Sequence, residues 1–499
     1  MVSHGRRVRS PLESEFAMPY NIRIVSTYPP RRCGIGTFSR DLATALAHFT
    51  AEVGYIRVAA IDNSSGPYGI PVDLTIDQYN PASWRDTIGH IITRAKESDH
   101  PTVVLLQHEY GLDPGDDGQD GQGTNFVKMA KIFTQNGLIA VVYLHTVLNN
   151  PDPHQKKVLL DLASSSDGLI VTTESAIQIL ESPTYGIPHA KLKHIDHGIR
   201  MQQRSQFDRL EIKRKHGLEN RFLVATIGLL SPDKGVQYGI RGYGKFLADS
   251  CTEAQRKNIV CLIAGQCHPE FVKADRGEPF RQYQAILAGA LDDAKLSWCK
   301  AKELRGVDFD KYDVVFLDTF LDETTLVELY GATNVMLLPY LNMQQVSSGI
   351  LADTLGSGRV AIVTKSLYAR ELIHSNKKCP EGVIIGRYAR GILVDPGEAS
   401  VPQIALALDY VVFNQHKRLM MERQAQQRGY QMRWDNSAWA LLQYVDFIRE
   451  QKEIITGRGI KFTREKPSPV QLTKRHDGLE GGTILHEIPS PPGADLTKV

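Results

Sequence analysis

The feature that most constrains the fold of this chain is a pattern of short apolar runs that alternate with helical stretches. The pattern occurs twice, once in each half of the chain. In its first half, five runs have the β-branched, apolar composition of strands: 21–28, 103–110, 138–145, 168–173 and 191–198. Apolar residues at helical spacing fill stretches between them, such as 37–49 and 154–164. Continuous apolar strands that alternate with helices are typical of parallel sheets covered on both faces. The pattern therefore predicts a doubly wound α/β domain.

The same alternation starts again in the second half. Five more strands are predicted at 221–230, 258–265, 313–320, 334–340 and 359–365, with helices over 236–248 and 323–332 among those between them. A length of 499 residues also suggests two or three domains. We expect five segments in order: a mobile leader at 1–19, an N-terminal Rossmann-like domain at 20–205, a second Rossmann-like domain at 206–410, C-terminal helices at 411–454 and a disordered tail at 455–499.

Composition excludes several classes of protein. The net charge of +2 gives no reason to expect a nucleic-acid or anionic-membrane partner. No apolar run approaches the ~18 residues of a membrane span, and the basic N-terminus lacks the apolar region of a secretory signal. Six cysteines without a CxxC pair do not make a disulfide scaffold, and Cys261 lies in an apolar run, which suits a core residue better than a metal ligand near Cys267 and His268. We expect a protein of the reducing cytoplasm.

The turn after the first strand, within 27–42, carries the first candidate site. Gly34 and Gly36 permit close approach of a ligand to the backbone, and helix amides near Thr37 would face an anion or a sugar. The spacing is not that of a Rossmann GxGxxG motif. An ordinary strand–turn–helix connection explains the same residues.

The stretch GLLSPDKG at 228–235 follows the first strand of the second half. Lys234 stands at the start of a helix, where a cation and free helix amides suit a pyrophosphate. A solvated lysine on a turn is the simpler alternative.

A third candidate lies within 339–358. Ser347, Ser348 and Gly349 predict a helix start with serine as the N-cap, and their amides would offer a second site for an anion. Asp353 follows about one turn into that helix. A plain capped helix with Asp353 on its solvated face is the alternative.

Two histidines end neighbouring predicted strands. His108 closes VVLLQH and His145 closes AVVYLH, so both are expected to project into a cleft between the domains. A neutral imidazole there can hydrogen-bond a sugar hydroxyl or a phosphate. Structural histidines would show the same pattern.

Taken together, these stretches resemble family 4 of the retaining nucleotide-sugar glycosyltransferases over about residues 21–450. The similarity includes CGIGTFSRDL, GLLSPDKG, DHGI at 196–199, the nucleotide-facing segment 316–340 and the eight-residue spacing of Gln345 and Asp353. The resemblance implies the GT-B fold: an α/β protein with two Rossmann-like doubly wound domains that face a central cleft, and C-terminal helices that pack back toward the N-terminal domain.

The chain departs from the family pattern at three positions. Leu229 stands where the family has arginine, Gln345 replaces the first acidic residue, and Asp353 is a shorter second one. The lost arginine removes a bidentate phosphate partner, which Arg31 or Arg32 could replace. Gln345 can hydrogen-bond a sugar but cannot act as a charged nucleophile.

The resemblance also implies roles for the site residues. Gln345 would lie near the donor sugar and Asp353 on the ribose; the two positions would be ~12 Å apart if the segment between them were helical. Lys234 and the amides around Ser348, Gly349 and Ile350 would stabilise the leaving diphosphate. The remaining assignments are donor contacts for Gly34, Gly36, Thr319 and Phe320, acceptor or sugar contacts for His145, Arg31 and Arg32, and a catalytic role for His108 alongside Lys234 and Gln345.

The leading hypothesis is a cytoplasmic, retaining glycosyltransferase that moves a hexose, mannose or glucose by family analogy, from a nucleotide sugar to a sugar, glycan or small-molecule acceptor. No metal and no cofactor are expected. A phosphorylase that uses sugar 1-phosphate and a catalytically silent binding protein are the alternatives, motivated by Leu229 and Gln345. The acidic loop 113–123 is either a flexible loop or a lid for the acceptor, with calcium binding a weaker option.

Overall fold

The computed structural model describes residues 19–63, 66–115, 122–199, 209–267, 269–374, 385 and 388–455. The expected leader and tail therefore lie outside the described residues, apart from Pro19 and Ile455. The described residues up to Lys452 belong to one compact unit, which holds both predicted α/β arrays. No described helix is both long and apolar enough to cross a bilayer.

The first half forms a sheet of seven parallel strands in the order β3-β2-β1-β4-β5-β6-β7. The strands are β1 Tyr20–Ser26, β2 Val53–Asp62, β3 Val72–Asp77, β4 Thr102–His108, β5 Ile139–Leu144, β6 Gly168–Val171 and β7 Leu192–His194. The order reverses between β1 and β4. Ligands of open α/β sheets bind at such a switch point, outside the carboxyl ends of the strands.

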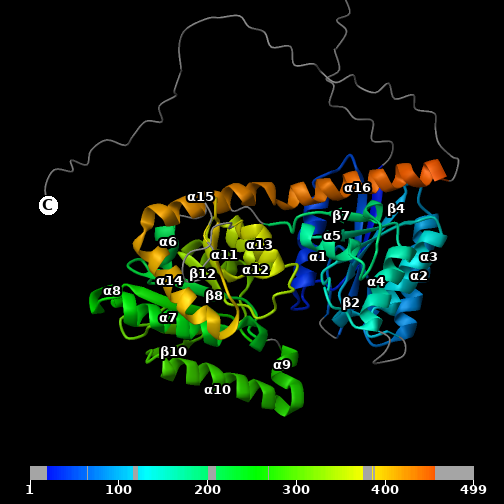
Figure 1. Cartoon of the computed structure of the whole chain (residues 1–499). Coiled ribbons are helices and arrows are strands. Elements are labelled where there is room, and N and C mark those ends of the chain that lie inside the picture. The colour runs from blue at the N-terminus through cyan, green and yellow to red at the C-terminus, as the bar shows by residue number, and fades with distance from the viewer. Residues whose placement is uncertain are drawn as a thin grey trace, which may run out of the picture. The chain divides into compact units, whose positions relative to one another are not determined.

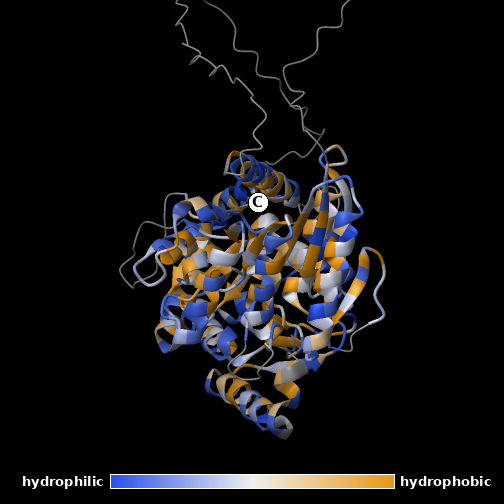
Figure 2. Ribbon diagram, turned by 90° about the vertical axis from the view of Figure 1, so that its right-hand side faces the viewer, coloured by the Kyte–Doolittle hydropathy of each residue, from blue (hydrophilic) through white to orange (hydrophobic). Residues whose placement is uncertain are grey.

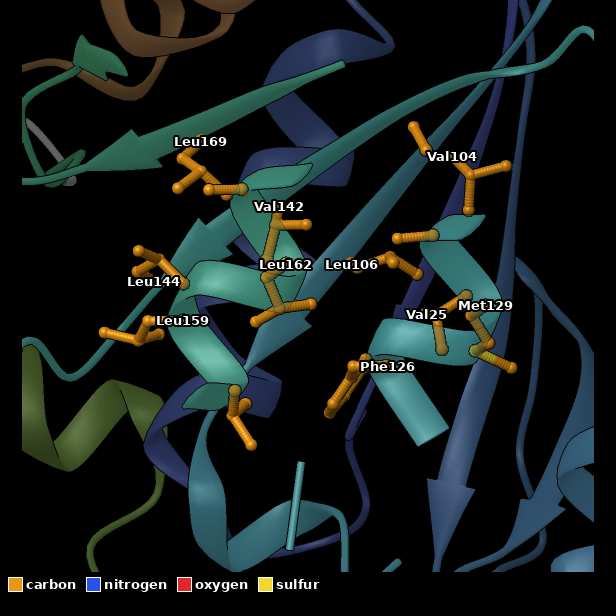
Figure 3. Packing of buried hydrophobic residues seen from close by; sticks show 14 of the residues in the cluster. Val25, Val104, Leu106, Phe126, Met129, Val142, Leu144, Leu159, Leu162 and Leu169 are labelled. Carbon is orange, nitrogen blue, oxygen red and sulfur yellow. The ribbon is translucent and has the colours of Figure 1, made fainter. Parts of the chain in front are cut away.

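Helices cover both faces of this sheet, and strand parity decides which face each side chain joins. Val104 and Leu106 of β4 pack with one core cluster, whereas Val103 and Leu105 pack with another. Figure 3 shows the first cluster, in which side chains of α3 and α4 meet the sheet. The helical elements of this half are α1 Gly34–Leu46, α2 Pro81–Lys96, η1 Tyr110–Leu112, α3 Thr124–Gln135, α4 Pro153–Ser165, α5 Glu174–Glu181 and η3 His189–Lys191.

The second half repeats the design with another seven-stranded parallel sheet, in the order β10-β11-β9-β8-β12-β13-β14. Its strands are β8 Phe222–Ile227, β9 Ile259–Ala264, β10 Trp298–Ala301, β11 Val314–Leu317, β12 Val335–Leu338, β13 Val360–Thr364 and β14 Gly391–Val394. Here the order reverses between β8 and β12. Figure 2 shows the apolar strands enclosed by helices with polar outer surfaces.

Helices again flank the second sheet. They are α6 Arg209–Lys215, η5 Pro232–Lys234, α7 Val236–Ser250, α8 Glu253–Lys257, α9 Pro269–Lys273, η6 Ala274–Gly277, α10 Glu278–Asp293, α11 Glu323–Ala332, α12 Gly349–Gly356, α13 Leu367–Ile373, η7 Gly397–Ala399 and α14 Ser400–Phe413. Cys261 is buried in this core, as expected for a small apolar residue.

The last two helices, α15 (Gln415–Gln431) and α16 (Trp434–Ile455), lead from the second sheet back to the first (Figure 1). Trp434, Leu441 and Val445 of α16 are buried in the same cluster as the first sheet. The Tyr20 hydroxyl donates a 2.6 Å hydrogen bond to Asp446. The expected return of the C-terminal helices to the N-terminal domain is therefore confirmed.

Candidate functional site

The turn GLLSPDKG follows β8 at the switch point of the second sheet. Gly235 has a φ of 61°, and a side chain there would overlap the carbonyl of Pro339, so the Lys234–Gly235 turn packs directly on the end of β12. The ammonium of Lys234 consequently lies 4.5 Å from the centre of the Tyr340 ring. Its nearest carboxylate is Asp233 at 3.7 Å, which is too far for a hydrogen bond.

The N-terminus of α12 lies at the same switch point. Ser348 is the N-cap, as predicted, and its hydroxyl accepts a 3.3 Å hydrogen bond from the Leu351 amide. The amides of Gly349 and Ile350 have no hydrogen-bond partner among the described residues. They remain available for an anion, which the helix dipole would also favour.

One side chain joins these two features. The ring of Tyr340 lies beneath Lys234, and the nearby Ser348 side chain partly offsets the rise that burial causes in the pKa of Tyr340. The Ile350 side chain lies against Gly228, the residue that follows β8. We call the group of Lys234, Tyr340, Ser348, Gly349 and Ile350 the anion site. The structure thus brings together the second and third predicted stretches.

Asp353 lies one turn further along α12 and carries an unusual carboxylate. Its pKa is raised to about 8, first by burial and then by the negative charges of Asp41 and Glu323. The pKa of Asp41, from α1, is itself raised to about 6 by burial, despite a 3.0 Å ion pair with Arg40. No hydrogen bond to the Asp353 carboxylate is found among the described residues. The oxygens of Asp353 are therefore available to accept hydrogen bonds from a ligand.

The glycine turn of the first sheet has two distinct parts. A side chain at Gly36 would press on the Tyr28 backbone at 3.3 Å, so this glycine is needed for the β1–α1 packing itself. A side chain at Gly34 would meet no protein atom within 4 Å. Gly34 therefore leaves open space at the start of α1, whereas Gly36 is structural.

The two arginines of this turn differ in their surroundings. Arg31 donates a 3.0 Å hydrogen bond to the carbonyl of Ile61, at the end of β2. The guanidinium of Arg32 stacks 4.2 Å from the ring centre of Phe320, which follows β11 of the second sheet and is 40% exposed. Arg32 and Phe320 therefore link the two domains, and the adjoining Thr319 is partly exposed.

The expectation that His108 projects into the cleft is wrong. Its side chain is completely buried in the first domain, against Tyr110 and Phe126, and neither ring nitrogen has a partner among the described residues. Burial lowers its pKa to about 3, so the ring is neutral. The physical reason is parity: His108 follows Val104 and Leu106 onto the α3–α4 face.

His145 lies on the opposite face. It follows Val141 and Tyr143, which face α1, and its ring packs edge-on against Phe38 of α1. The Nε2 of His145 is 2.7 Å from the side-chain oxygen of Gln107. His145 is partly exposed, and burial lowers its pKa to about 3. It is therefore the histidine of the pair that combines a neutral ring with solvent access.

Gln345 lies before the helix, in the loop that leads to α12. Its backbone carbonyl accepts a hydrogen bond from the Tyr368 amide at 3.0 Å, and its side chain is partly exposed. The helix begins only at Gly349, so the segment from Gln345 to Asp353 is not wholly helical. The Thr172 hydroxyl donates to the neighbouring Val346 carbonyl at 3.1 Å, which ties this loop to the first domain.

Further contacts hold the two domains together around the site. The carboxylate of Glu371, in α13, accepts hydrogen bonds from the amides of Glu174 (3.0 Å) and Ser175 (2.7 Å) and from the Ser175 hydroxyl. It thus occupies the N-terminus of α5, where the helix dipole favours a negative charge. Arg40 forms a second link, an ion pair with Glu323 at 3.1 Å.

A cavity of about 510 Å³ lies in the second domain beside these elements. It lies between α10 and the ends of β9 and β11, and its walls are mostly apolar, with Tyr283, Trp298 and Phe316 among them. Leu230 of the GLLSPDKG turn and Asp318 lie at one side. This volume falls in the usual range of small-molecule pockets.

The sequence interpretation missed several residues of this region. Tyr340 joins the anion site, Asp41 approaches Asp353 from the other domain, and Glu109 accepts a 2.6 Å hydrogen bond from Thr146 at the strand ends. His197 lies beside Gly349 and packs edge-on against Phe38. The HisGly dipeptide directly before the domain joint was the available signal for His197.

The acidic loop 113–123 is described only at its ends. Asp113 is buried, and its carboxylate accepts hydrogen bonds from the amides of Gly115 and Phe126 and from the Asn125 side chain at 2.8–2.9 Å. This aspartate therefore fixes the start of α3. Residues 116–121, on which the lid and calcium hypotheses depend, lie outside the described residues.

Comparison with solved structures identifies the architecture. Anabaena Alr3699/HepE, solved with UDP and glucose, has a TM-score of 0.58 and 14% sequence identity over 85% of this chain and 99% of its own. The chain has the GT-B fold. The α,α-trehalose-phosphate synthase (UDP-forming) of Burkholderia xenovorans, solved with glucose-6-phosphate, has a TM-score of 0.58 and 14% identity over 86% of this chain and 100% of its own.

These structural neighbours are GT-B glycosyltransferases, and the predicted two-domain α/β fold is thereby confirmed. No protein-family profile matches the chain, and no curated protein matches it by sequence. At 14% identity, the resemblance carries the fold, and the function has to be argued from the site.

Proposed function

We propose that this chain is a retaining glycosyltransferase of family 4 that transfers a hexose from a nucleotide sugar to a sugar, glycan or small-molecule acceptor. The observation that carries the proposal is the anion site. An ammonium over the Tyr340 ring and two helix amides without a partner among the described residues lie at the switch point of the second sheet. A diphosphate supplies the negative charge that such a group binds.

The rest of the donor fits around the diphosphate. Burial and the charges of Asp41 and Glu323 raise the pKa of Asp353, so its carboxyl group would ionise when the donor binds. The carboxylate would then accept hydrogen bonds from the vicinal ribose hydroxyls. The adjoining apolar cavity, lined by Leu230 and Asp318, would take the base. Uridine is the base to test first, because structural neighbours were solved with UDP.

The reaction needs no charged nucleophile from the protein. The bond between the anomeric carbon and the diphosphate oxygen breaks, and the acceptor oxygen attacks from the face that the leaving group departs from. The acceptor proton passes to an oxygen of the leaving phosphate. Lys234 and the amides of Gly349 and Ile350 would stabilise the developing charge, a role that needs no metal. Gln345 would then hydrogen-bond the sugar rather than attack it.

His145 would contact the sugar or the acceptor from the first domain, since it is neutral and partly exposed. Gly34 would allow the ligand to approach the start of α1. Arg32 lies at the domain boundary, where a second positive charge could replace the arginine missing at Leu229.

A thermal-shift panel of UDP, GDP and ADP tests the proposal. A nucleotide present at 100 times its Kd should stabilise the chain by about 2.7 kcal/mol. The preferred nucleotide is then supplied as its glucose and mannose derivatives, with release of the nucleoside diphosphate as the readout. Stabilisation by none of the three nucleotides would contradict the proposal.

The alternative function is a phosphorylase that uses sugar 1-phosphate. Leu229 favours it because a substrate with fewer phosphates needs fewer positive charges than a nucleotide sugar does. The same assay separates the two activities. Release of inorganic phosphate from a sugar 1-phosphate, with no turnover of nucleotide sugars, would favour the phosphorylase.

A further inference from the structure

The segment 196–199, between β7 and the domain joint, is held by the junction of the two C-terminal helices. Asp196 pairs with Arg428 of α15 at 2.6 Å. Ile199 donates its amide to the Met432 carbonyl at 2.8 Å and accepts the Trp434 amide at 3.3 Å. The Trp434 ring covers Gly198 so closely that any side chain at that position would overlap it. His197 is therefore fixed in place from both sides.

The hydrogen bonding of His197 defines its tautomer. Its Nδ1 lies 2.7 Å from the carbonyl oxygen of Gly198. A carbonyl oxygen only accepts, so Nδ1 carries the hydrogen. Burial lowers the pKa of His197 to about 4, and the ring is neutral at physiological pH. Nε2 therefore carries a lone pair, which can only accept a hydrogen bond.

This lone pair lies within the candidate site. The Nε2 of His197 is 3.6 Å from the position that a side-chain carbon on Gly349 would occupy, at the first residue of α12. Phe38 packs edge-on against both His197 and His145, with ring centres 5.1 and 4.9 Å away. Nε2 has no hydrogen-bond partner among the described residues. It thus lies beside the anion site, on a ring that shares its Phe38 contact with His145.

The chemistry of the expected ligand determines which part of it meets this lone pair. A diphosphate offers acceptors only and would be repelled by another acceptor. The hydroxyls of a sugar can donate. We propose that Nε2 of His197 accepts a hydrogen bond from a hydroxyl of the sugar being transferred, so that His197 is a binding and specificity residue for the donor. The inference rests on the proposed function and goes beyond it by orienting the sugar toward the first domain.

Three variants separate this role from packing. His197→Phe keeps the ring against Phe38 and Trp434 but removes both nitrogens. His197→Gln places an amide oxygen near the level of Nε2, whereas His197→Asn reaches only the level of Nδ1. Calorimetric titration of UDP and of UDP-glucose gives, for each variant, the gain in affinity that the sugar provides.

For the wild-type chain we expect UDP-glucose to bind more tightly than UDP. His197→Phe and His197→Asn should reduce this sugar-dependent gain by roughly three- to tenfold, the value of one neutral hydrogen bond. UDP itself should bind within about twofold of wild type, because the anion site is intact, and His197→Gln should recover most of the gain. Should His197→Phe fail to fold, the comparison of glutamine with asparagine decides.

Two results contradict the inference in different ways. An unchanged sugar-dependent gain in His197→Phe, or equal losses in the glutamine and asparagine variants, would overturn the role of His197 alone. A wild-type chain that binds no nucleotide or nucleotide sugar would contradict the proposed function, and this inference with it.

Discussion

Asp353→Asn should make the free protein more stable at alkaline pH while weakening nucleotide binding. The folded state holds the pKa of Asp353 at about 8, well above the ordinary value of 3.8, because burial and the charges of Asp41 and Glu323 oppose ionisation. Between pH 4 and 8 the folded chain therefore binds more protons at this site than the unfolded chain. Stability falls as pH rises through that window, and it stays lowered above pH 8. Asparagine removes the penalty.

The size of the effect follows from the pKa. A change from 3.8 to about 8 corresponds to at most ~6 kcal/mol of unfolding free energy, at about 1.4 kcal/mol per pH unit. Asp353 is partly exposed, so water screens much of this penalty. We expect a gain of about 2 kcal/mol for Asp353→Asn at pH 8.5 and almost none at pH 4.5. Losing the carboxylate should cost about 1.5–3 kcal/mol of nucleotide binding, roughly 10- to 150-fold.

Urea unfolding of wild type and variant at pH 4.5, 6.5 and 8.5 measures the first effect, and calorimetric titration of UDP measures the second. Asp292→Asn, near the exposed end of α10, is the matched control and should leave stability almost unchanged at all three pH values. If Asp353→Asn showed the same stability difference from wild type at all three pH values, the assignment of a raised pKa would be refuted. Unchanged UDP affinity would refute the ribose role.

Three further predictions test other parts of the site. Lys234→Ala should lower transfer by on the order of 100-fold, measured as kcat/KM, while Lys257→Ala on the exposed surface of α8 should leave it unchanged; equal rates for both would remove Lys234 from the mechanism. Gly36→Ala should lower stability by about 1 kcal/mol through its contact with the Tyr28 backbone, whereas Gly34→Ala should keep wild-type stability and weaken donor binding; thermal unfolding and titration distinguish them. Glu371→Ala should lower stability by about 2 kcal/mol, because it removes the hydrogen bonds to the N-terminus of α5. It should also increase the radius of gyration measured by X-ray scattering. Unchanged scattering would contradict a role of Glu371 in holding the domains together.

The sequence predicted ten strands of the two sheets, and most of them are buried along their whole length, because parallel strands covered on both faces leave a plain record in composition. The short and partly exposed β7 (LKH) is the exception. It missed β2, β3, β10 and β14. The first part of β2 contains Gly54 and the exposed Arg57, and β10 is a half-exposed edge strand. These two strands carry little of the apolar signal, and their presence depends on a neighbouring strand that the chain supplies elsewhere. β14 is apolar and buried, but it has only four residues and begins with a glycine.

The two histidines show that the sequence does not reveal which face of the sheet a side chain joins. His108 and His145 both end predicted strands, and the sequence treats them alike. In the folded sheet they face opposite sides, because His108 shares the even-numbered face of β4, while His145 continues the face of Val141 and Tyr143. Which face leads to the cleft depends on where α1 and α3 pack. Contacts between domains, such as Arg32 with Phe320, depend on the arrangement of two folded units and leave no local pattern.

The return of α16 to the first sheet has a consequence for biosynthesis. Trp434, Leu441 and Val445 complete a core whose other members begin at Tyr20, and Tyr20 itself bonds to Asp446. A ribosome finishes the first sheet hundreds of residues before it makes the helix that seals it. The nascent N-terminal domain therefore keeps an uncovered apolar face until α16 has been synthesised, and it can complete its core only then.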